Sequence, residues 1–380
     1  MTAGIYLHIP FCRSKCFYCD FPSFDCCESL FDDYIAALCR EIAVRAGHHS
    51  PTAINTVYIG GGTPTLLSQR QLARVSEALY RYWDIAGDAE FSIEANPGTV
   101  DLPKLRFLRS LGVNRISFGV QSFNDGLLKS IGRIHSARQA FNAIYSAKLA
   151  EFSNINIDLM YGLPRQTTDD WKHALATAVT LEIQHISSYG LKVEEGTPFY
   201  ALEQQGCLEL PSEEDDESMY DTVTCFLPEQ GFLRYEISNY ALPGCECQHN
   251  LKYWRYQSYI GIGAGAHSFD DGRRFANTSD VAEYISRIRG GQSACAFEER
   301  PVKEEAMAEF VFLALRTVSG LSFAAFKKQF GIDFLHQYTT VANDLNNSGL
   351  LDIRADGAVL TNKGMKFGNA AFAAFLPGKS

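Results

Sequence analysis

Several features that assign proteins to common classes are missing from this 380-residue sequence. No apolar run approaches the roughly 20 residues that a membrane-spanning helix needs. No block of Lys and Arg side chains marks a surface for nucleic acid or lipid, and the formal net charge is −10. We therefore expect a soluble protein that has no nucleic-acid partner.

Secretory and phosphate-binding signatures are also missing. The opening residues 1–4 (MTAG) are unlike the basic and apolar start of a secretory signal. The glycines at 60–62 are not followed by the Gly-Lys-Ser/Thr of a P-loop. The chain has 11 Cys, an odd number, so a disulfide framework is not expected. We expect a cytoplasmic location, where thiols stay reduced and available to iron.

Three cysteines form the most informative pattern. Cys12, Cys16 and Cys19 give the spacing CxxxCxxC, directly after the apolar run 4–11. Three thiolates at this spacing fit three corners of a cubane [4Fe–4S] cluster and leave one iron open to another ligand. The alternatives are buried apolar thiols, part of a disulfide set, or three-quarters of a zinc site. Zinc would require a fourth ligand at a regular offset, and none lies nearby.

Strand-like and helix-like segments alternate over the first half of the chain. This order predicts an α/β fold with a parallel sheet and helices outside it. Six units are too few for an eight-fold barrel, so we expect a partial (β/α)6 TIM-like barrel that is open on one side. The predicted strands are 5–9, 56–59, 90–94, 115–120, 154–160 and 185–190, and the predicted helices are 30–46, 68–82, 103–111, 137–147 and 168–181.

Polar motifs cluster at the ends of these strands. The cysteine loop follows the first strand, residues 60–65 (GGGTPT) follow the second, and 94–98 (EANPG) close the third. Gln121 follows the fourth strand and Asp158 lies in the fifth. Ligands of α/β barrels bind at this rim, so we predict one site assembled from these separate segments.

The second half of the chain has a different pattern. We divide the sequence into a barrel over 1–240, a linker region over 241–300 and a C-terminal domain over 301–380. The last part resembles a small winged-helix unit, with a hairpin whose turn holds an Asp-Gly pair. Its third helix is not basic, which argues against DNA binding. The predicted elements are helices 304–317, 322–330 and 334–348 and hairpin strands 350–354 and 358–361.

The cysteine spacing, with Tyr18 just before the last Cys, resembles the radical S-adenosylmethionine superfamily. The resemblance implies that the amino and carboxylate groups of S-adenosylmethionine chelate the open iron, and that one electron can cleave the sulfonium to a deoxyadenosyl radical. It also implies that 60–63 hold the methionine amino group and that Tyr18 lies against the adenine.

The coproporphyrinogen dehydrogenase-like branch of that superfamily is a closer match. The shared strings are 6–12 (YLHIPFC), 60–65, 115–123 (RISFGVQSF), 132–133 and 156–164 (NIDLMYGLP), and the resemblance covers essentially the whole chain. It implies S-adenosylmethionine contacts from Tyr6, Gly61, Gly62, Thr63, Glu94, Gln121, Arg133 and Asp158. Carboxylates suit ribose hydroxyls or an ammonium, and a guanidinium suits a carboxylate. Singly, Asp158 can also be a buried strand-end carboxylate, and Arg133 a surface ion-pair partner.

Two departures separate the chain from the dehydrogenase. That family has a further Cys where this chain has Phe21, and it has an N-terminal extension before the cluster loop. Residues 19–21 (CDF), 235–239 (YEISN) and 249–254 (HNLKYW) instead resemble the HemW family of heme chaperones. The resemblance implies heme binding at the last string. His249 can ligate heme iron, and Tyr253 and Trp254 can flank a flat macrocycle.

Other readings of this region stay open. His249 can be an ordinary loop histidine and Trp254 a core residue. A Cys-x-Cys-x-His string over 245–249 can bind a metal or offer a thiolate to heme, and His267 on a glycine-rich turn is a further imidazole.

By resemblance we expect a heme chaperone that binds heme, a [4Fe–4S] cluster and S-adenosylmethionine. It would pass heme to respiratory hemoproteins by transient docking at the membrane, as a monomer or dimer. The alternative is an enzyme, either an oxygen-independent coproporphyrinogen III dehydrogenase or another radical enzyme of tetrapyrroles. We assign no catalytic residue.

Overall fold

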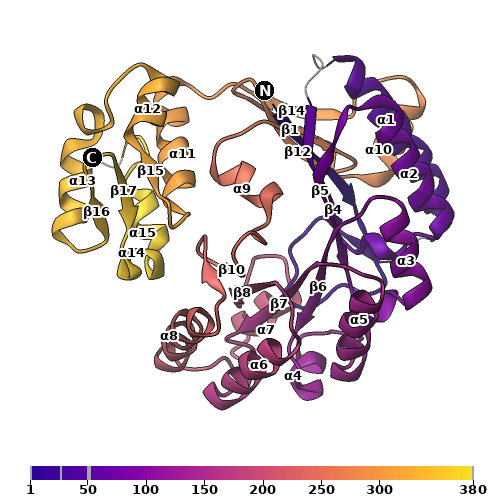
Figure 1. Ribbon diagram of the computed structural model, residues 1–380, viewed down its shortest axis with the longest axis horizontal. Helices are drawn as coiled ribbons and strands as arrows, with labels where there is room; N and C mark the ends of the chain where they lie inside the picture. Colours follow the sequence, from indigo (N-terminus) through magenta and orange to yellow (C-terminus); the bar gives the residue numbers. More distant parts are fainter. Residues whose placement is uncertain (1, 26–27, 49–52, 379–380) are drawn as a thin grey trace.

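Six parallel strands form the centre of the structure, a computed structural model that describes residues 2–25, 28–48 and 53–378 (Figure 1). They lie side by side in chain order, each parallel to the next. All six predicted strands are confirmed, with ends that differ by a few residues. Their bounds are β1 (Thr2–Ile9), β4 (Ala53–Gly61), β5 (Ile85–Ala95), β6 (Arg115–Gln121), β7 (Asn154–Tyr161) and β8 (His185–Gly190).

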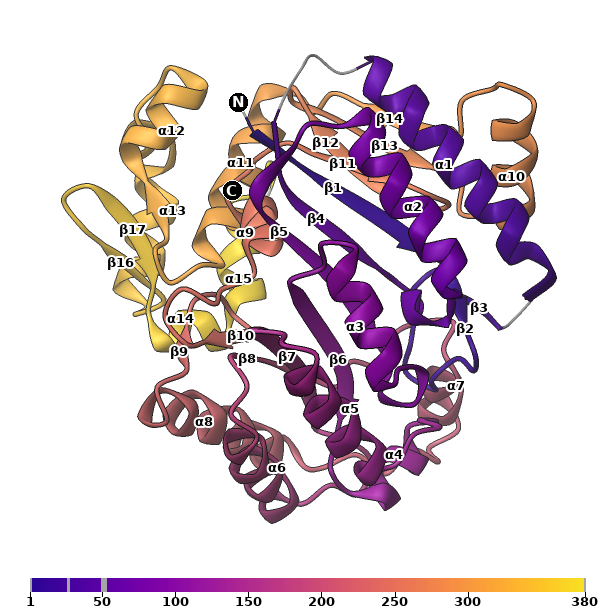
Figure 2. The same ribbon diagram turned by 45° about the vertical axis from the view of Figure 1, so that its right-hand side comes forward.

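Helices between these strands cover the outer face of the sheet (Figure 2). Three of them begin with a capping box, at Ser68, Ser136 and Thr167. In each, the cap side chain accepts from the backbone N–H three residues on, and the side chain of that residue accepts from the cap's own N–H. The five predicted helices correspond to α1 (Phe31–His48), α2 (Gln69–Tyr82), α3 (Leu102–Ser110), α5 (Ala137–Leu149) and α6 (Thr168–Thr180). The further helices α4 (Asp125–Ser130), α7 (Pro198–Gln204) and α8 (Glu213–Glu229) complete this part of the chain.

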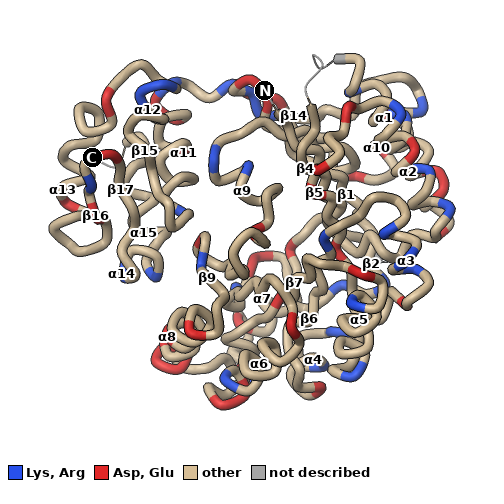
Figure 3. The backbone as a smooth tube through the Cα atoms, viewed as in Figure 1, with Lys and Arg blue, Asp and Glu red and all other residues tan. Residues whose placement is uncertain are grey.

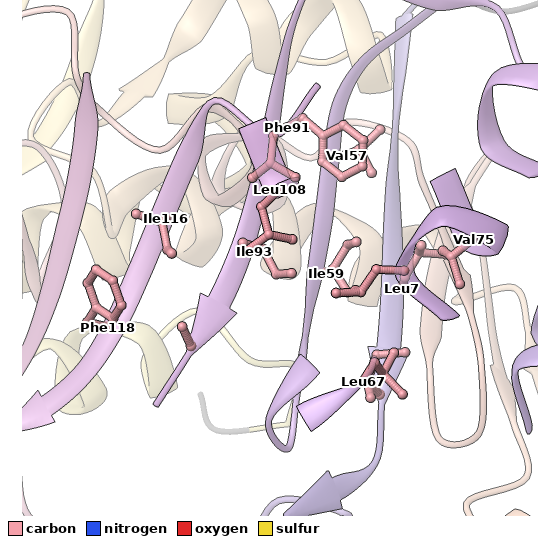
Figure 4. Packing of buried hydrophobic residues seen from close by; sticks show 14 of the residues in the cluster. Leu7, Val57, Ile59, Leu67, Val75, Phe91, Ile93, Leu108, Ile116 and Phe118 are labelled. Carbon is pink, nitrogen blue, oxygen red and sulfur yellow. The ribbon is translucent and has the colours of Figure 1, made fainter. Parts of the chain in front are cut away.

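The outer face of the six strands is apolar. Ile59, Ile93 and Ile116 are buried on three neighbouring strands and share one hydrophobic cluster with Val75 of α2 and Leu108 of α3 (Figure 4). Burying a side chain of this size stabilises the fold by about 1.5–3 kcal/mol relative to exposing it. The helix layer is therefore held to the sheet by every second residue of each strand.

The residues that alternate with these apolar ones are polar. They include Tyr58, Glu94, Ser117, Asn156 and Asp158, and they hydrogen-bond to one another from strand to strand. Because each strand has apolar side chains on its outer face and hydrogen-bonding side chains on its inner face, the sheet encloses a polar interior rather than a hydrophobic core. This inner face is the foundation of the candidate site.

Residues 241–300, the predicted linker region, hold four strands that extend the sheet. The segment holds α9 (Gln248–Trp254), β11 (Tyr259–Ile262), β12 (His267–Asp270), β13 (Arg273–Asn277), α10 (Val281–Arg289) and β14 (Cys295–Glu299). β11 pairs in parallel with β1, and β12 to β14 continue outward from it. The physical reason is that β1 would otherwise present an unpaired backbone edge. The strands are short and interrupted by glycine, which hides their periodicity. Where domain boundaries fall near 240 and 300 stays a prediction.

The other end of the sheet is also extended. β10 (Asn239–Ala241) pairs antiparallel with β8, and β9 (Leu233–Arg234) pairs with β10. The sheet therefore has twelve strands in the described chain, and the seven from β11 to β8 are parallel.

The C-terminal part forms its own hydrophobic core, which contains Phe326, Phe334 and Phe375. The three predicted helices and the hairpin are present, and β15 (Leu321–Ser322) adds a third strand. Helix α13 (Phe334–Asn347) contains no Lys or Arg, so no part of it is blue in Figure 3. The other elements are α11 (Lys303–Leu315), α12 (Phe323–Phe330), β16 (Leu351–Ile353), β17 (Gly357–Leu360), α14 (Asn362–Lys366) and α15 (Gly368–Ala373).

One buried carboxylate ties α1 to the extended sheet, and its removal should destabilise the protein. Glu41 accepts hydrogen bonds from Gly263 N at 2.9 Å, Asn277 Nδ2 at 2.8 Å and Tyr284 Oη at 2.7 Å. Because Glu41→Ala leaves these buried donors unpaired, we expect the free energy of unfolding to fall by about 3 kcal/mol. Urea denaturation followed by circular dichroism measures this. Glu77→Ala, on the exposed side of α2, is the control and should change it by less than about 0.5 kcal/mol. Equal effects would contradict the prediction.

Candidate functional site

The three cysteines lie in the loop that follows β1, at the carboxyl end of the central strands. The loop carries a small parallel pair, β2 (Phe11–Cys12) and β3 (Phe24–Asp25). Cys12, Cys16 and Cys19 are free thiols, and all three are half-buried. Burial raises the pKa of the Cys12 and Cys19 thiols, and a hydrogen bond from Thr63 partly offsets this at Cys12. The thiols are thus shielded from solvent but not sealed.

An arginine guanidinium lies beside one of these thiols. Arg133 Nη1 lies 3.5 Å from Cys16 Sγ, which puts a fixed positive charge beside the sulfur that would carry negative charge.

The glycine motif packs tightly against the cysteine loop. Gly61 has φ of +111°, and a Cβ there would lie 2.6 Å from the ring of His8. A Cβ at Gly62 would lie 2.6 Å from the carbonyl oxygen of Phe11. The amides of Gly62 and Thr63 already donate to the carbonyls of Ile9 and Phe11, at 2.8 and 2.7 Å. The motif therefore needs glycine for this close approach, and the amides of Gly62 and Thr63 are not available to a ligand.

Two carboxyl groups face the interior of the barrel. Glu94 accepts from Tyr58 Oη at 2.8 Å and from the Gly61 amide at 3.0 Å. Burial raises the pKa of Glu94 to about 7, and the charge of Asp158 adds to the effect. Asp158 accepts from Asn156 Nδ2 at 2.8 Å, and burial raises its pKa as well. Both groups are hydrogen-bond acceptors directed into the same space.

Arg133 points into the site and is not a surface ion-pair partner. Its guanidinium donates to Asn96 Oδ1 at 2.5 Å and also to the carbonyl oxygen of Gly119. Its Nε is buried and has no hydrogen-bond partner among the described residues. A buried donor of this kind is costly unless a ligand completes it, so the site has room for an acceptor.

Gln121 supplies a second unpaired atom. It ends β6 with φ of +65°, a backbone conformation that non-glycine residues rarely adopt. Its Oε1 is buried and, in the described chain, unpaired. A polar ligand that carries both a donor and an acceptor would satisfy the two atoms, Gln121 Oε1 as acceptor and Arg133 Nε as donor.

The two predicted tyrosines adjoin this centre, because Tyr18 interacts with Cys16 and Arg133, and Tyr6 interacts with Glu94. Tyr6 Oη is 3.0 Å from His8 Nδ1, and its ring stacks near Tyr58 at 6.2 Å. Tyr18 packs against a separate apolar cluster that contains Ile131 and Leu163. Burial raises the pKa of Tyr18, so it stays a neutral donor. The predicted site residues thus border the carboxyl end or the inner face of the barrel, and His249 reaches the inner face from the other end, where its ring stacks on Tyr58.

His249 closes the opposite, amino-terminal end of the barrel. Helix α9 lies between the sheet and the C-terminal part (Figure 1), and Glu90 of β5 accepts from the amides of Gln248 and His249 at its start. The imidazole of His249 is 0% exposed. Its ring nitrogens lie 2.9 Å from Thr56 Oγ1 and 2.9 Å from Tyr253 Oη. Burial lowers the pKa of His249 to about 3, so it is neutral, and iron would reach it only if α9 moved.

A cavity of about 450 Å³ opens beside α9. Tyr253 and Trp254, the predicted flanking aromatics, line it. Tyr256, Tyr259 and Phe269 line it too, and sequence reasoning missed them because it placed no strands in this region. The density of aromatic residues over 253–269 was the available signal.

Comparison with known proteins defines the class. Residues 6–178 match the model of the Radical SAM superfamily, and residues 303–367 match the HemN C-terminal domain. The solved coproporphyrinogen III oxidase (HemN) from Escherichia coli, a radical SAM enzyme, superposes with a TM-score of 0.87 over 99% of this chain and 90% of that one. The two are 24% identical in sequence. The protein therefore has a radical SAM fold followed by a HemN-type C-terminal domain.

Closer relatives narrow this class to one family. The heme chaperone HemW of Bacillus subtilis is 39% identical over 372 residues, 98% of both chains. The heme chaperone HemW of Lactococcus lactis is 37% identical over 377 residues, 98% of this chain and 96% of that one. The heme chaperone HemW of Escherichia coli is 39% identical over 282 residues, 72% of this chain and 73% of that one. The chain belongs to the HemW family.

The raised pKa of Glu94 predicts a pH-dependent stability that Glu94→Gln removes. Because the folded pKa of about 7 lies above the ordinary value of 4.5, the stability contributed by the protonated group is lost as pH rises between these values. Relative to wild type, the Gln variant should therefore gain stability between pH about 5 and pH about 8. Urea denaturation of the cluster-free protein at both pH values tests this, with exposed Glu77→Gln as control. A stability difference that does not change with pH would contradict it.

Proposed function

We propose that the protein binds heme, a [4Fe–4S] cluster and S-adenosylmethionine, and delivers heme to respiratory hemoproteins. Membership of the HemW family supports the heme, and the radical SAM fold supports the other two. The observation that carries the cofactor site is the meeting of three free thiols with two orphaned polar atoms, Arg133 Nε and Gln121 Oε1, at the end of the strands.

Cys12, Cys16 and Cys19 would hold three irons of the cluster, which when bound supplies an open Lewis-acidic iron and one electron. Arg133 would pair with the carboxylate of S-adenosylmethionine and Gln121 would accept from one of its donors. Tyr6, Tyr18, Gly61, Gly62, Thr63, Glu94 and Asp158 are the remaining proposed contacts. Carbonyl groups of the glycine motif suit the methionine ammonium, since its amides are already paired.

The heme part of the proposal includes the segment 249–254. The family resemblance suggests His249 as the iron ligand. This assignment stays a prediction, and it requires α9 to move away from the amino-terminal end of the barrel. Transient membrane docking would bring heme to its acceptors. In the described chain, helices long and apolar enough to cross a membrane are absent. A cytoplasmic location, a monomeric or dimeric state and the absence of a nucleic-acid partner belong to the same proposal.

The competing activity, porphyrinogen decarboxylation, gives a direct test. The protein is reconstituted with iron and sulfide without oxygen, then titrated with heme in one sample. A second sample receives coproporphyrinogen III, reductant and S-adenosylmethionine. We expect stoichiometric heme binding and no protoporphyrinogen. Turnover of the porphyrinogen would overturn the chaperone assignment, and so would failure to bind heme.

The cluster assignment is tested by Cys16→Ala. Loss of one of three thiolates should reduce bound iron and sulfide from about four of each per chain to a small fraction, because the remaining two cannot hold the cubane. Iron and sulfide analysis with visible absorption measures this. Cys207→Ala, which removes an exposed thiol elsewhere, is the matched control and should keep full content. Full content in the Cys16 variant would remove this loop as the cluster site.

A further inference from the structure

The aromatic cavity lies where three parts of the fold meet. Tyr6 and His8 of β1 and the cysteine-loop residue Phe21 form one side. Helix α9 and strands β11 to β13 form the wall, and Glu309 and Leu313 of α11 close it from the C-terminal part. Arg274 of β13 makes an ion pair with Glu309 across this junction. The cavity is therefore a defined space between the barrel sheet and the C-terminal domain, a common place for ligand sites.

Its walls are rich in packed aromatic rings. Tyr253 packs edge-on against Tyr259 with ring centres 4.5 Å apart, and Tyr256 packs against Phe269 at 4.4 Å. The guanidinium of Arg316 lies over the ring of Trp254, 4.4 Å from the ring centre. Aromatic walls and a volume of about 450 Å³ suit a large planar ligand.

Three imidazoles lie in or near this cavity, and their availability differs. The ring nitrogens of His8 lie 3.0 Å from Tyr6 Oη and 3.1 Å from the carbonyl oxygen of Pro22, and its side chain is buried. Both ring nitrogens of His249 are paired as well. His267, on β12, is exposed to the cavity, and among the described residues neither of its ring nitrogens has a hydrogen-bond partner. Only His267 offers a free nitrogen to a metal without rearrangement.

We propose that heme occupies this cavity and that His267 is the ligand of its iron. This rests on the proposed function, which supplies heme as the cargo. An imidazole nitrogen is a usual axial ligand of heme iron, and aromatic walls cover the macrocycle. His249 then acts as a positioning residue, because its nitrogen holds the hydroxyl of Tyr253 at the wall.

The same arrangement accounts for Phe21. Its side chain is 61% exposed, which is unusual for so large an apolar group, and it lines the cavity from the cysteine loop. A macrocycle in the cavity would cover it. Phe21 also lies two positions from Cys19, so the loop that would hold the cluster also lines the proposed heme cavity.

The test is a heme titration of His267→Ala, followed by visible absorption. We expect the affinity to fall about tenfold or more and the iron-ligand spectrum of the wild type to be lost. Added imidazole should restore that spectrum, because the free base refills the vacated position. His173→Ala, which removes an exposed histidine on α6, is the control and should bind heme as wild type does. His249→Ala should weaken binding but keep the wild-type iron-ligand spectrum.

A second variant tests the cavity apart from the iron. Leu313→Trp fills the space from α11, so it should lower heme affinity while leaving iron and sulfide content unchanged. If wild type binds heme and His267→Ala keeps its affinity and spectrum, the inference is overturned and the proposed function stands. Loss of the iron-ligand spectrum in His249→Ala alone would assign the iron to His249. Failure of wild type to bind heme would overturn the proposed function itself.

Discussion

The opposite character of the two faces of the central strands governs the rest of the structure. Every second side chain packs against helices, and the intervening ones form hydrogen-bonded groups, Tyr58 with Glu94 and Ser117 with Asn156 and Asp158. A polar interior is stable only if each group has a partner or a ligand. Arg133 Nε and Gln121 Oε1 are two of the buried atoms that lack a partner in the described chain, and both lie near the cysteine loop.

The two ends of this interior are closed by different means. At the carboxyl end the cysteine loop and the glycine motif lie in contact, which is why Gly61 and Gly62 cannot carry side chains. At the amino end, helix α9 is held by the carboxylate of Glu90 at its first amides. The first turn of α9 thus seals the barrel with His249, and its last turn lines the aromatic cavity with Tyr253 and Trp254. The motif HNLKYW therefore has two structural tasks.

Much of this fold follows from local sequence pattern. The six strands and the helices between them were predicted because their apolar spacing is regular and their caps are strong. The meeting of the cysteines, Glu94, Gln121 and Arg133 at one rim was also predictable, since parallel strands bring their carboxyl ends together. The strands of 241–300 were not, because they are defined by pairing with β1 rather than by their own periodicity. The burial of His249 was hidden for a similar reason, since its partners Thr56 and Glu90 are distant in sequence.

The pairing of the first strand has a consequence for how the protein is made. Gly4 pairs with Tyr259 in β11, so the backbone groups along one edge of β1 have no strand partner until residues 259–262 have been synthesised. Contacts this distant in sequence slow folding and leave unpaired edges exposed to other chains. The cavity walls come from β1, β11 to β13 and α11, so neither half of the chain contains a complete site. Cutting the gene into an isolated barrel would therefore discard the aromatic wall along with the C-terminal domain.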